Sequence, residues 1–182
     1  QGYFCQQIRK DGWQDDVYRV LDRRNAPIET LRNSDAHPLT MNLRIGPMSL
    51  YLTISRINVG AVSVYLIGTD TELNSLQDQD LTSRLYSGDR EHRIRQEILL
   101  GIGGIRLLRL VGISPRVYHA NEGHTAFMML ERLRELVAGG IRLAEAQDIV
   151  RATTVFTTHT PVPAGHDTFP FPMVEKHFAG YW

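Results

Sequence analysis

The chain has 182 residues, 42% of them hydrophobic, and its 20 basic and 20 acidic residues cancel to a formal net charge of zero. This length allows one domain with a sizeable core, and the charge balance argues against a surface that coats nucleic acid or binds an anionic membrane. A single cysteine, Cys5, excludes an internal disulfide and any multi-cysteine metal site, and the absence of a membrane-span run or signal-peptide pattern predicts a cytoplasmic protein.

The N-terminal part of the chain favours antiparallel β-structure. Residues 2–25 show no clear period. Over residues 41–70, alternating positions rich in β-branched and aromatic side chains, broken at 58–60, predict a hairpin or meander that leads into a buried strand. A polar connection with little periodicity follows over residues 71–88.

Residues 89–112 predict a helix, because apolar residues recur on one face at spacings of three and four: Ile94, Ile98, Ile102, Ile105 and Leu108. The sequence GIGG at 101–104 is not a dinucleotide-binding fingerprint, which needs a strand before its glycines and a helix that starts at them. We therefore interpret these glycines as a place where another helix packs closely.

A βαβ unit is predicted next, and such units build parallel sheets with right-handed crossovers. It comprises a strand at 116–119, a helix at about 124–138 and a second strand at 153–158, with a shorter helix near 143–152 between them. The longer helix is expected to turn four residues inward: Ala126, Leu130, Leu133 and Val137. A last helix is predicted at 174–181.

Two segments run from an apolar stretch into clustered titratable side chains: residues 117–124 (VYHANEGH) and 155–167 (VFTTHTPVPAGHD). In α/β proteins, ligands bind in the crevice outside the carboxyl ends of the strands. Glu122, His124 and His159 are therefore predicted to face such a crevice. His119 is more simply explained as a core or hydrogen-bonding residue.

Metal and nucleophile chemistry have weaker support. Imidazole and carboxylate groups can ligate zinc, but no pair has the helical HExxH spacing, so we predict no metal site among His119, Glu122, His124, His159, His166 and Asp167. The nucleophile elbow Gly-x-Ser-x-Gly is missing, and Cys5 has no histidine near it in sequence, which argues against a nucleophilic hydrolase.

Several motifs in the same order resemble the α-glucan (glycogen, starch or maltodextrin) phosphorylases of the shorter bacterial and archaeal type. The resemblance covers nearly the whole chain and is weakest over residues 23–56. It rests on the segments GYF (2–4), QI (7–8), DGWQ (11–14), LYSGDRE (85–91), RQEILLGIGG (95–104), YHANEGH (118–124) and RATTVFTTHTPVPAGHD (151–167).

The resemblance implies an α/β fold with a Rossmann-like parallel sheet and flanking helices, plus the small antiparallel meander, within a glycosyltransferase-B architecture. In that arrangement two Rossmann-like domains face a cleft, and residues 1–182 are part of the first, with the meander at about 41–70 and the βαβ region at about 89–182. The implied reaction is attack of inorganic phosphate on the non-reducing end of an α-1,4-glucan, which releases glucose 1-phosphate with retained configuration.

The resemblance also implies site residues. His159 would lie under the terminal glucose, with its ring bonded to a sugar hydroxyl and its main-chain carbonyl facing the anomeric carbon, where a carbonyl dipole suits developing positive charge. The sugar pocket and its gate would contain the other substrate-binding residues: Asn121, Glu122, His124, Thr160 and Asp89. Family members are often homo-oligomers, and neither nucleic acid nor membrane is an expected partner.

Departures from the family pattern limit what this chain can do alone. The implied cofactor is pyridoxal phosphate, whose phosphate group relays a proton, but neither Lys10 nor Lys176 has the context of the attachment lysine. The family's glycine-rich loop and the second domain are also missing, so we expect an inactive fragment. Ala120 and Thr125 replace the expected Met and Ser. Two alternatives remain open: a sugar-nucleotide glycosyltransferase of the same architecture, and a non-catalytic carbohydrate-binding module.

Overall fold

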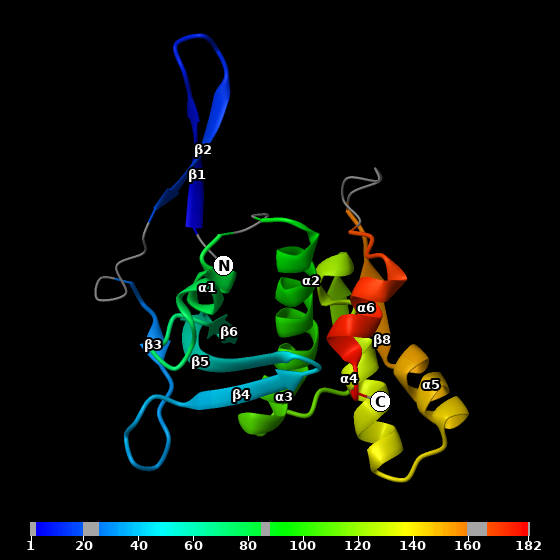
Figure 1. The fold of residues 1–182 in the computed structure, drawn as a ribbon. Helices are drawn as coiled ribbons and strands as arrows, with labels where there is room; N and C mark the ends of the chain where they lie inside the picture. Colours follow the sequence, from blue (N-terminus) through cyan, green and yellow to red (C-terminus); the bar gives the residue numbers. More distant parts are fainter. Residues whose placement is uncertain (1–2, 20–25, 85–87, 160–166, 182) are drawn as a thin grey trace. The chain divides into compact units, whose positions relative to one another are not determined.

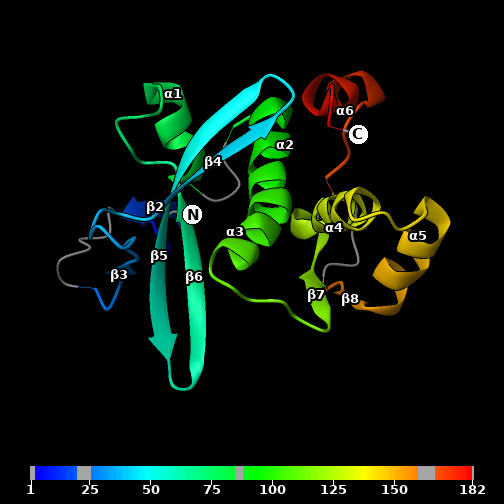
Figure 2. The same ribbon diagram turned by 90° about the horizontal axis from the view of Figure 1, so that it is seen from below.

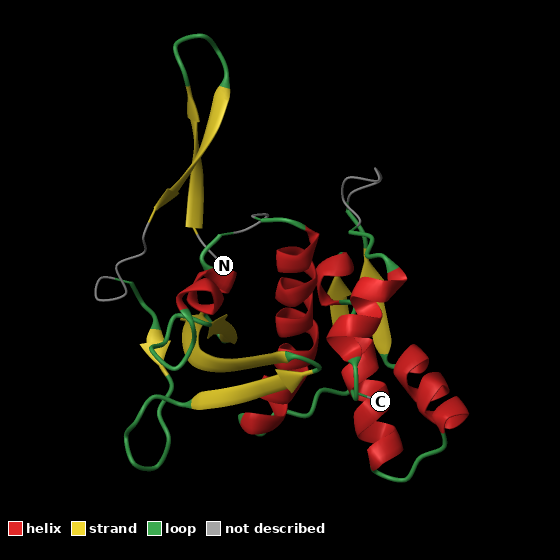
Figure 3. Ribbon diagram, viewed as in Figure 1, coloured by secondary structure: helices red, strands yellow, loops and turns green. Residues whose placement is uncertain are grey.

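The structure is a computed structural model that describes residues 3–19, 26–84, 88–159 and 167–181. The chain forms two compact units, which we call the N-unit (Gln1–Leu43 with Ser49–Gly88) and the C-unit (Arg44–Met48 with Asp89–Trp182). The architecture is mixed α/β with several small sheets (Figures 1 and 3). None of the helices in the described ranges is long and apolar enough to cross a membrane.

The N-unit begins with a hairpin that the sequence reading left unassigned. Strands β1 (Tyr3–Ile8) and β2 (Gln14–Arg19) pair antiparallel, with Ile8 opposite Gln14 next to the turn. Gly12 has a φ of +83° in that turn, a conformation that costs glycine little. The strands YFCQQI and QDDVYR lack the apolar alternation of a half-buried sheet, which explains why periodicity did not detect them.

The antiparallel strands expected over residues 41–70 are present (Figure 2). The prediction that the last of them is buried was wrong, because no residue of that strand is buried and Val62 is 64% exposed. Strand β5 (Met48–Val59) lies between β3 (Glu29–Thr30) and β4 (Thr40–Ile45) and also pairs with β6 (Val62–Gly68). Its alternate residues are buried, as half-buried strands require: Met48, Leu50, Leu52 and Ile54.

The polar connection at 71–88 contains the short helix α1 (Leu76–Gln79), which Ser75 caps through its side chain, and a 3₁₀ turn (Asp80–Thr82) directly after it. Its anchor is the buried Asn74, whose amide nitrogen donates to the carbonyl oxygens of Tyr51 at 2.7 Å and Thr69 at 2.8 Å. The Tyr51 N–H donates back to the Asn74 amide oxygen at 2.8 Å. A helix this short leaves no apolar period for the sequence to reveal.

In the C-unit, the helix predicted at 89–112 is present but interrupted. It consists of α2 (Arg90–Ile98), a π-helical turn (Leu99–Gly103) and α3 (Gly104–Leu110). Four predicted apolar residues are buried: Ile94, Ile98, Ile102 and Ile105. A Cβ on Gly101 would lie 2.8 Å from the backbone nitrogen of Met128, so the close-packing interpretation holds at this glycine.

The predicted βαβ unit follows, with β7 (Tyr118–Asn121) and β8 (Thr154–Thr157) paired in parallel. Between them lie α4 (Met128–Ala138) and α5 (Leu143–Ala152), and the chain continues into α6 (Phe171–Phe178) (Figure 1). This observation establishes one parallel strand pair with a helical crossover.

Several boundaries differ from the predictions. β7 starts two residues later than expected, and a 3₁₀ turn (Gly123–Thr125) precedes α4 where continuous α-helix was predicted. Val137 was predicted to point inward but is 43% exposed, because it belongs to the last turn of α4. Helix α6 starts at Phe171, since Pro172 occupies its first turn, where a missing N–H costs nothing.

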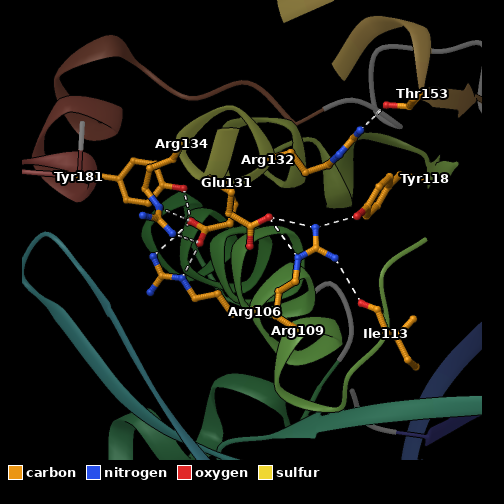
Figure 4. Close-up of polar contacts among 10 residues, drawn as sticks. Arg106, Arg109, Ile113, Tyr118, Glu131, Arg132, Arg134, Thr153 and Tyr181 are labelled. Atoms are coloured by element: carbon orange, nitrogen blue, oxygen red, sulfur yellow. Dashed lines mark hydrogen bonds and ion pairs between the residues drawn. The ribbon is translucent and has the colours of Figure 1, made fainter. Parts of the chain in front are cut away.

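A buried ion network links α3, α4 and the end of the chain (Figure 4). The side chain of Glu131 is 0% exposed and accepts hydrogen bonds from Arg106 at 2.8 Å, Arg134 at 2.7 Å and the Tyr181 hydroxyl at 2.5 Å. Burial opposes ionisation of Glu131, but these donors outweigh it and lower its pKa to about 2.

Arg132, also on α4, contacts the first residues of both parallel strands (Figure 4). The Arg132 guanidinium donates to Thr154 at 2.6 Å and to the Thr153 hydroxyl, and it lies 3.9 Å from the centroid of the Tyr118 ring. The Tyr118 hydroxyl in turn accepts from Arg109 at 2.7 Å. Charged donors and a cation–π contact therefore fix the start of β7 relative to that of β8.

Candidate active site

Polar residues follow both parallel strands at their carboxyl ends. The strands are in register with Asn121 opposite Thr157, and the Glu122 N–H donates to the Thr157 carbonyl at 2.8 Å. Continuing each chain by one or two residues brings Glu122 next to His159. The structure thus unites three of the predicted site residues, Asn121, Glu122 and His159, at one edge of the strand pair.

Glu122 bridges the ends of the two strands with its carboxylate. One oxygen, Oε1, accepts from the His159 main-chain N–H at 2.5 Å, and Oε2 accepts from the Thr158 hydroxyl at 3.2 Å. Glu122 is only 7% exposed and has a φ of +59° with a ψ of −179°. A non-glycine residue there carries strain of about 1–3 kcal/mol, which the bonds to the β8 end offset.

The imidazole of His159 is exposed and contacts Asn121, with 3.0 Å between Nε2 and the amide oxygen. An amide oxygen can only accept, so Nε2 is the donor in this contact, and in a neutral ring Nδ1 is then the acceptor. His119 lies on β7 with Nε2 2.6 Å from the Thr157 hydroxyl. That contact agrees with the prediction that His119 is a hydrogen-bonding residue.

A second polar cluster in the C-unit contains His124, together with Arg93 and Glu97 of α2 and Asp167. Nη2 of Arg93 lies 3.5 Å from Nδ1 of His124. The same guanidinium donates to Asp167 through Nε at 3.2 Å and through Nη2. We call these four residues the Arg93 cluster. Ligand atoms of three of them lie within 4.8 Å of one another: Glu97, His124 and Asp167.

Charges within the Arg93 cluster shift two pKa values in opposite directions. Burial, then the hydrogen bond and negative charge of Asp167, raise the pKa of Glu97 to about 8, against the pull of Arg93. Burial also disfavours charge on Asp167, but hydrogen bonds from Arg93 and Glu97 and the charge of Arg93 lower its pKa overall. Of the two carboxyl groups, Glu97 is therefore the one on which the surroundings favour a proton.

Sequence reasoning named His124 and Asp167 but missed Arg93 and Glu97. A signal for Glu97 was present, because it lies between Ile94 and Ile98 on the apolar face of the predicted helix. A charged residue on a buried face needs a partner. Glu97 is in fact 5% exposed.

The other predicted site residues are not among the described members of either polar cluster. Asp89 is exposed and caps α2, where its Oδ1 accepts from the His92 N–H at 2.9 Å. Thr160 and His166 lie outside the described residues.

Comparison with known proteins relates the chain to phosphorylases, although no protein-family model matches it. It is 46% identical over 180 residues to maltodextrin phosphorylase of Thermococcus litoralis and 43% identical over 183 residues to glycogen phosphorylase of Mycobacterium tuberculosis. It is 34% identical over 178 residues to glycogen phosphorylase of Aquifex aeolicus. These alignments cover 99%, 97% and 98% of the chain, respectively.

The same alignments cover 22%, 21% and 26% of the three relatives, so the chain spans about a fifth to a quarter of their length. The matched region includes both strand ends and the Arg93 cluster. The chain is therefore homologous, over almost its whole length, to one segment of the maltodextrin and glycogen phosphorylases.

Proposed function

We propose that the protein containing this chain is an α-glucan phosphorylase, which transfers the terminal glucosyl unit of an α-1,4-glucan to inorganic phosphate. In this reaction the bond between the anomeric carbon and the glycosidic oxygen breaks, and the departing glucan takes up a proton at that oxygen. A phosphate oxygen bonds the anomeric carbon, and the product is glucose 1-phosphate with retained configuration. The βαβ unit would belong to a Rossmann-like domain of a glycosyltransferase-B architecture.

The observation that carries the proposal is the bonded trio of Asn121, Glu122 and His159 at the ends of the parallel strands. The carboxyl ends of such strands are where α/β proteins bind ligands, and the homologous segment of the named phosphorylases spans all three positions. In this trio the His159 imidazole can hydrogen-bond a sugar hydroxyl, and Glu122 holds the His159 backbone in place.

His159 would act in two ways on the terminal glucose. Nδ1, the acceptor left by the Nε2 contact with Asn121, can accept a hydrogen bond from a sugar hydroxyl. The main-chain carbonyl would face the anomeric carbon, where its dipole stabilises the positive charge that develops as the glycosidic bond lengthens. Asn121 and Glu122 would orient the ring and backbone, and His124, Thr160 and Asp89 would contribute further substrate contacts.

Pyridoxal phosphate, the cofactor expected for this family, finds no attachment residue among the described residues. An amine that forms a Schiff base is activated in a desolvated or cationic pocket. Lys10 is exposed, and the side chain of Lys176 is 59% exposed and bound to Glu91 at 2.7 Å. Neither lysine therefore fits the role of the attachment residue.

The test is an assay of the complete protein encoded by the reading frame that contains this chain. With maltodextrin, we expect glucose 1-phosphate to form only when inorganic phosphate is present. Release of free glucose without phosphate, or a requirement for a nucleotide sugar, would overturn the proposal.

A further inference from the structure

One oxygen of the buried Glu97 carboxyl group has no hydrogen-bond partner among the described residues. Oε1 is buried and accepts no hydrogen bond from the described residues, and the nearest cationic atom recorded, Nη2 of Arg93, is 3.9 Å away. An ionised carboxylate whose oxygen is buried without a hydrogen bond loses its hydration energy and gains nothing in return. A neutral acid avoids most of that cost, because its carbonyl oxygen is a much weaker acceptor.

The charges around Glu97 favour the neutral form. Arg93 and Glu97 face the cluster from α2, His124 faces it from the 3₁₀ turn after β7, and Asp167 faces it from the segment before α6. Arg93 already donates twice to Asp167, so its charge is matched by that carboxylate. A second negative charge on Glu97 would have to share Arg93 with Asp167 and would repel that carboxylate.

A metal ion bound between Glu97, His124 and Asp167 would be less favourable than a proton on Glu97. The spacing of Glu97, His124 and Asp167 would suit a divalent cation. However, the Arg93 side chain is only 14% exposed and its guanidinium donates directly to Asp167, so a cation bound there would be repelled by a positive charge at hydrogen-bond distance. A proton satisfies the same two carboxyl groups without displacing Arg93.

We propose that Glu97 is a protonated positioning residue, which donates a hydrogen bond to Asp167 and, with Arg93, holds that residue against α2. Asp167 lies eight positions after His159 in the chain. The shared proton therefore anchors the polypeptide on the C-terminal side of the candidate catalytic histidine. In line with this role, the pKa of Glu97 is raised to about 8, so the anchor is intact at neutral pH and weakens in alkali.

Infrared spectroscopy of the complete protein tests the proposal directly, because a protonated carboxyl group has a C=O stretch above the amide bands, which an ionised carboxylate lacks. At about pH 6, well above the ordinary glutamate pKa of about 4.3, the wild-type protein should show such a band. Glutamate labelled with ¹³C should shift it, and it should disappear as the pH rises through about 8. Glu97→Gln should remove the band, and Asp167→Asn should make it disappear at lower pH.

Glu145→Gln is the matched control, because the Glu145 side chain is 57% exposed and the change should leave the band in place. The proposal is wrong if the labelled wild type has no shifted band at about pH 6, or if Glu97→Gln retains it. Added zinc that abolishes the wild-type band at neutral pH would also overturn it, in favour of a metal site. The labelled wild type is decisive even if a variant does not fold.

A kinetic test rests on the proposed function. Glu97→Gln keeps a neutral donor toward Asp167, so its kcat/KM at neutral pH should stay within about threefold of the wild-type value. Because glutamine does not ionise, the fall in kcat/KM at alkaline pH should begin at a higher pH than in the wild type. Glu97→Ala should lose at least tenfold in kcat/KM below about pH 8, where Glu97 of the wild type is protonated, and less above it. An unchanged alkaline limb in Glu97→Gln would contradict the positioning role, whereas an inactive wild type would count against the proposed function alone, because the infrared result is independent of activity.

Discussion

The main-chain N–H of His159 donates a 2.5 Å hydrogen bond to Oε1 of Glu122, across the ends of two parallel strands. The acceptor residue has left-handed backbone geometry, and its second oxygen is bonded to Thr158. The Glu122 carboxylate thus holds the backbone of His159 at the end of β8.

Replacing His159 with Ala should lower kcat/KM of the complete protein by about thirty- to a thousandfold. The change removes a ring hydrogen bond worth roughly 2–4 kcal/mol in the transition state, together with some local order, but leaves the main-chain carbonyl in place. Steady-state kinetics with maltodextrin and phosphate measure the effect. A kcat/KM near the wild-type value in a folded variant would reduce His159 to a packing role.

Replacing Glu122 with Gln should cost less than His159→Ala. The amide keeps one oxygen to accept from the His159 N–H, and its nitrogen can donate to the Thr158 hydroxyl, so the backbone stays in place. Glu122→Ala removes both bonds and should cost at least tenfold more in kcat than Glu122→Gln. Equal losses in the two variants would show that the charge, and not the hydrogen-bonded shape, is what the site requires.

Replacing Glu131 with Gln should destabilise the protein by roughly 3–5 kcal/mol at neutral pH, because two buried or half-buried arginines lose their counter-ion. The pKa of Glu131 is lowered to about 2 in the folded state. Its stabilisation is therefore complete above the unfolded pKa of about 4.3 and declines as the pH falls toward 2.

The measurement for Glu131→Gln is the difference in denaturation midpoint from the wild type at several pH values. That difference should shrink below about pH 4.3. Glu145→Gln again serves as the control, since its pair with Arg142 is exposed and 4.0 Å long, and exposed pairs contribute at most about 1 kcal/mol. A difference independent of pH would mean that packing, and not charge, stabilises the network.

Two glycines of the interrupted helix should respond oppositely to alanine. At Gly101 the new Cβ would lie 2.8 Å from backbone nitrogen of Met128 and 3.0 Å from Phe127, and such overpacking costs about 1–3 kcal/mol. At Gly104 nothing lies within 4 Å, so alanine should stabilise the helix by up to about 1 kcal/mol. Denaturant midpoints of the two variants decide this, and the same sign at both positions would contradict it.

Borohydride reduction of the cofactor-loaded complete protein, followed by peptide mapping, should place the pyridoxyl label outside residues 1–182. The reason is the exposure of Lys10 and of Lys176, which also pairs with Glu91. Recovery of a stoichiometric label on either lysine would contradict this expectation. Lys176→Arg provides the control, because it keeps the charge and should leave labelling unchanged.

Local pattern was sufficient for the regular elements of the C-unit. The apolar spacing from Ile94 to Ile105 predicted a helix, and the glycine run at 101–104 was correctly separated from a nucleotide motif, because both inferences depend on neighbours along the chain. The hairpin of β1 and β2 was missed, since its strands do not alternate between apolar and polar residues.

The order of residues along the chain was enough to show that polar residues follow two strands, and the motifs were enough to relate the chain to phosphorylases. What each polar residue contacts is visible only in the folded chain: Glu122 accepts a hydrogen bond from the His159 backbone 37 positions away, and Arg93 donates to Asp167, 74 positions away. The first contact depends on parallel pairing and on a left-handed residue that no local propensity predicts, and the second depends on the packing of distant segments against α2. The unusual protonation of Glu97 has the same origin, because burial and a distant carboxylate together set the energy of its charge.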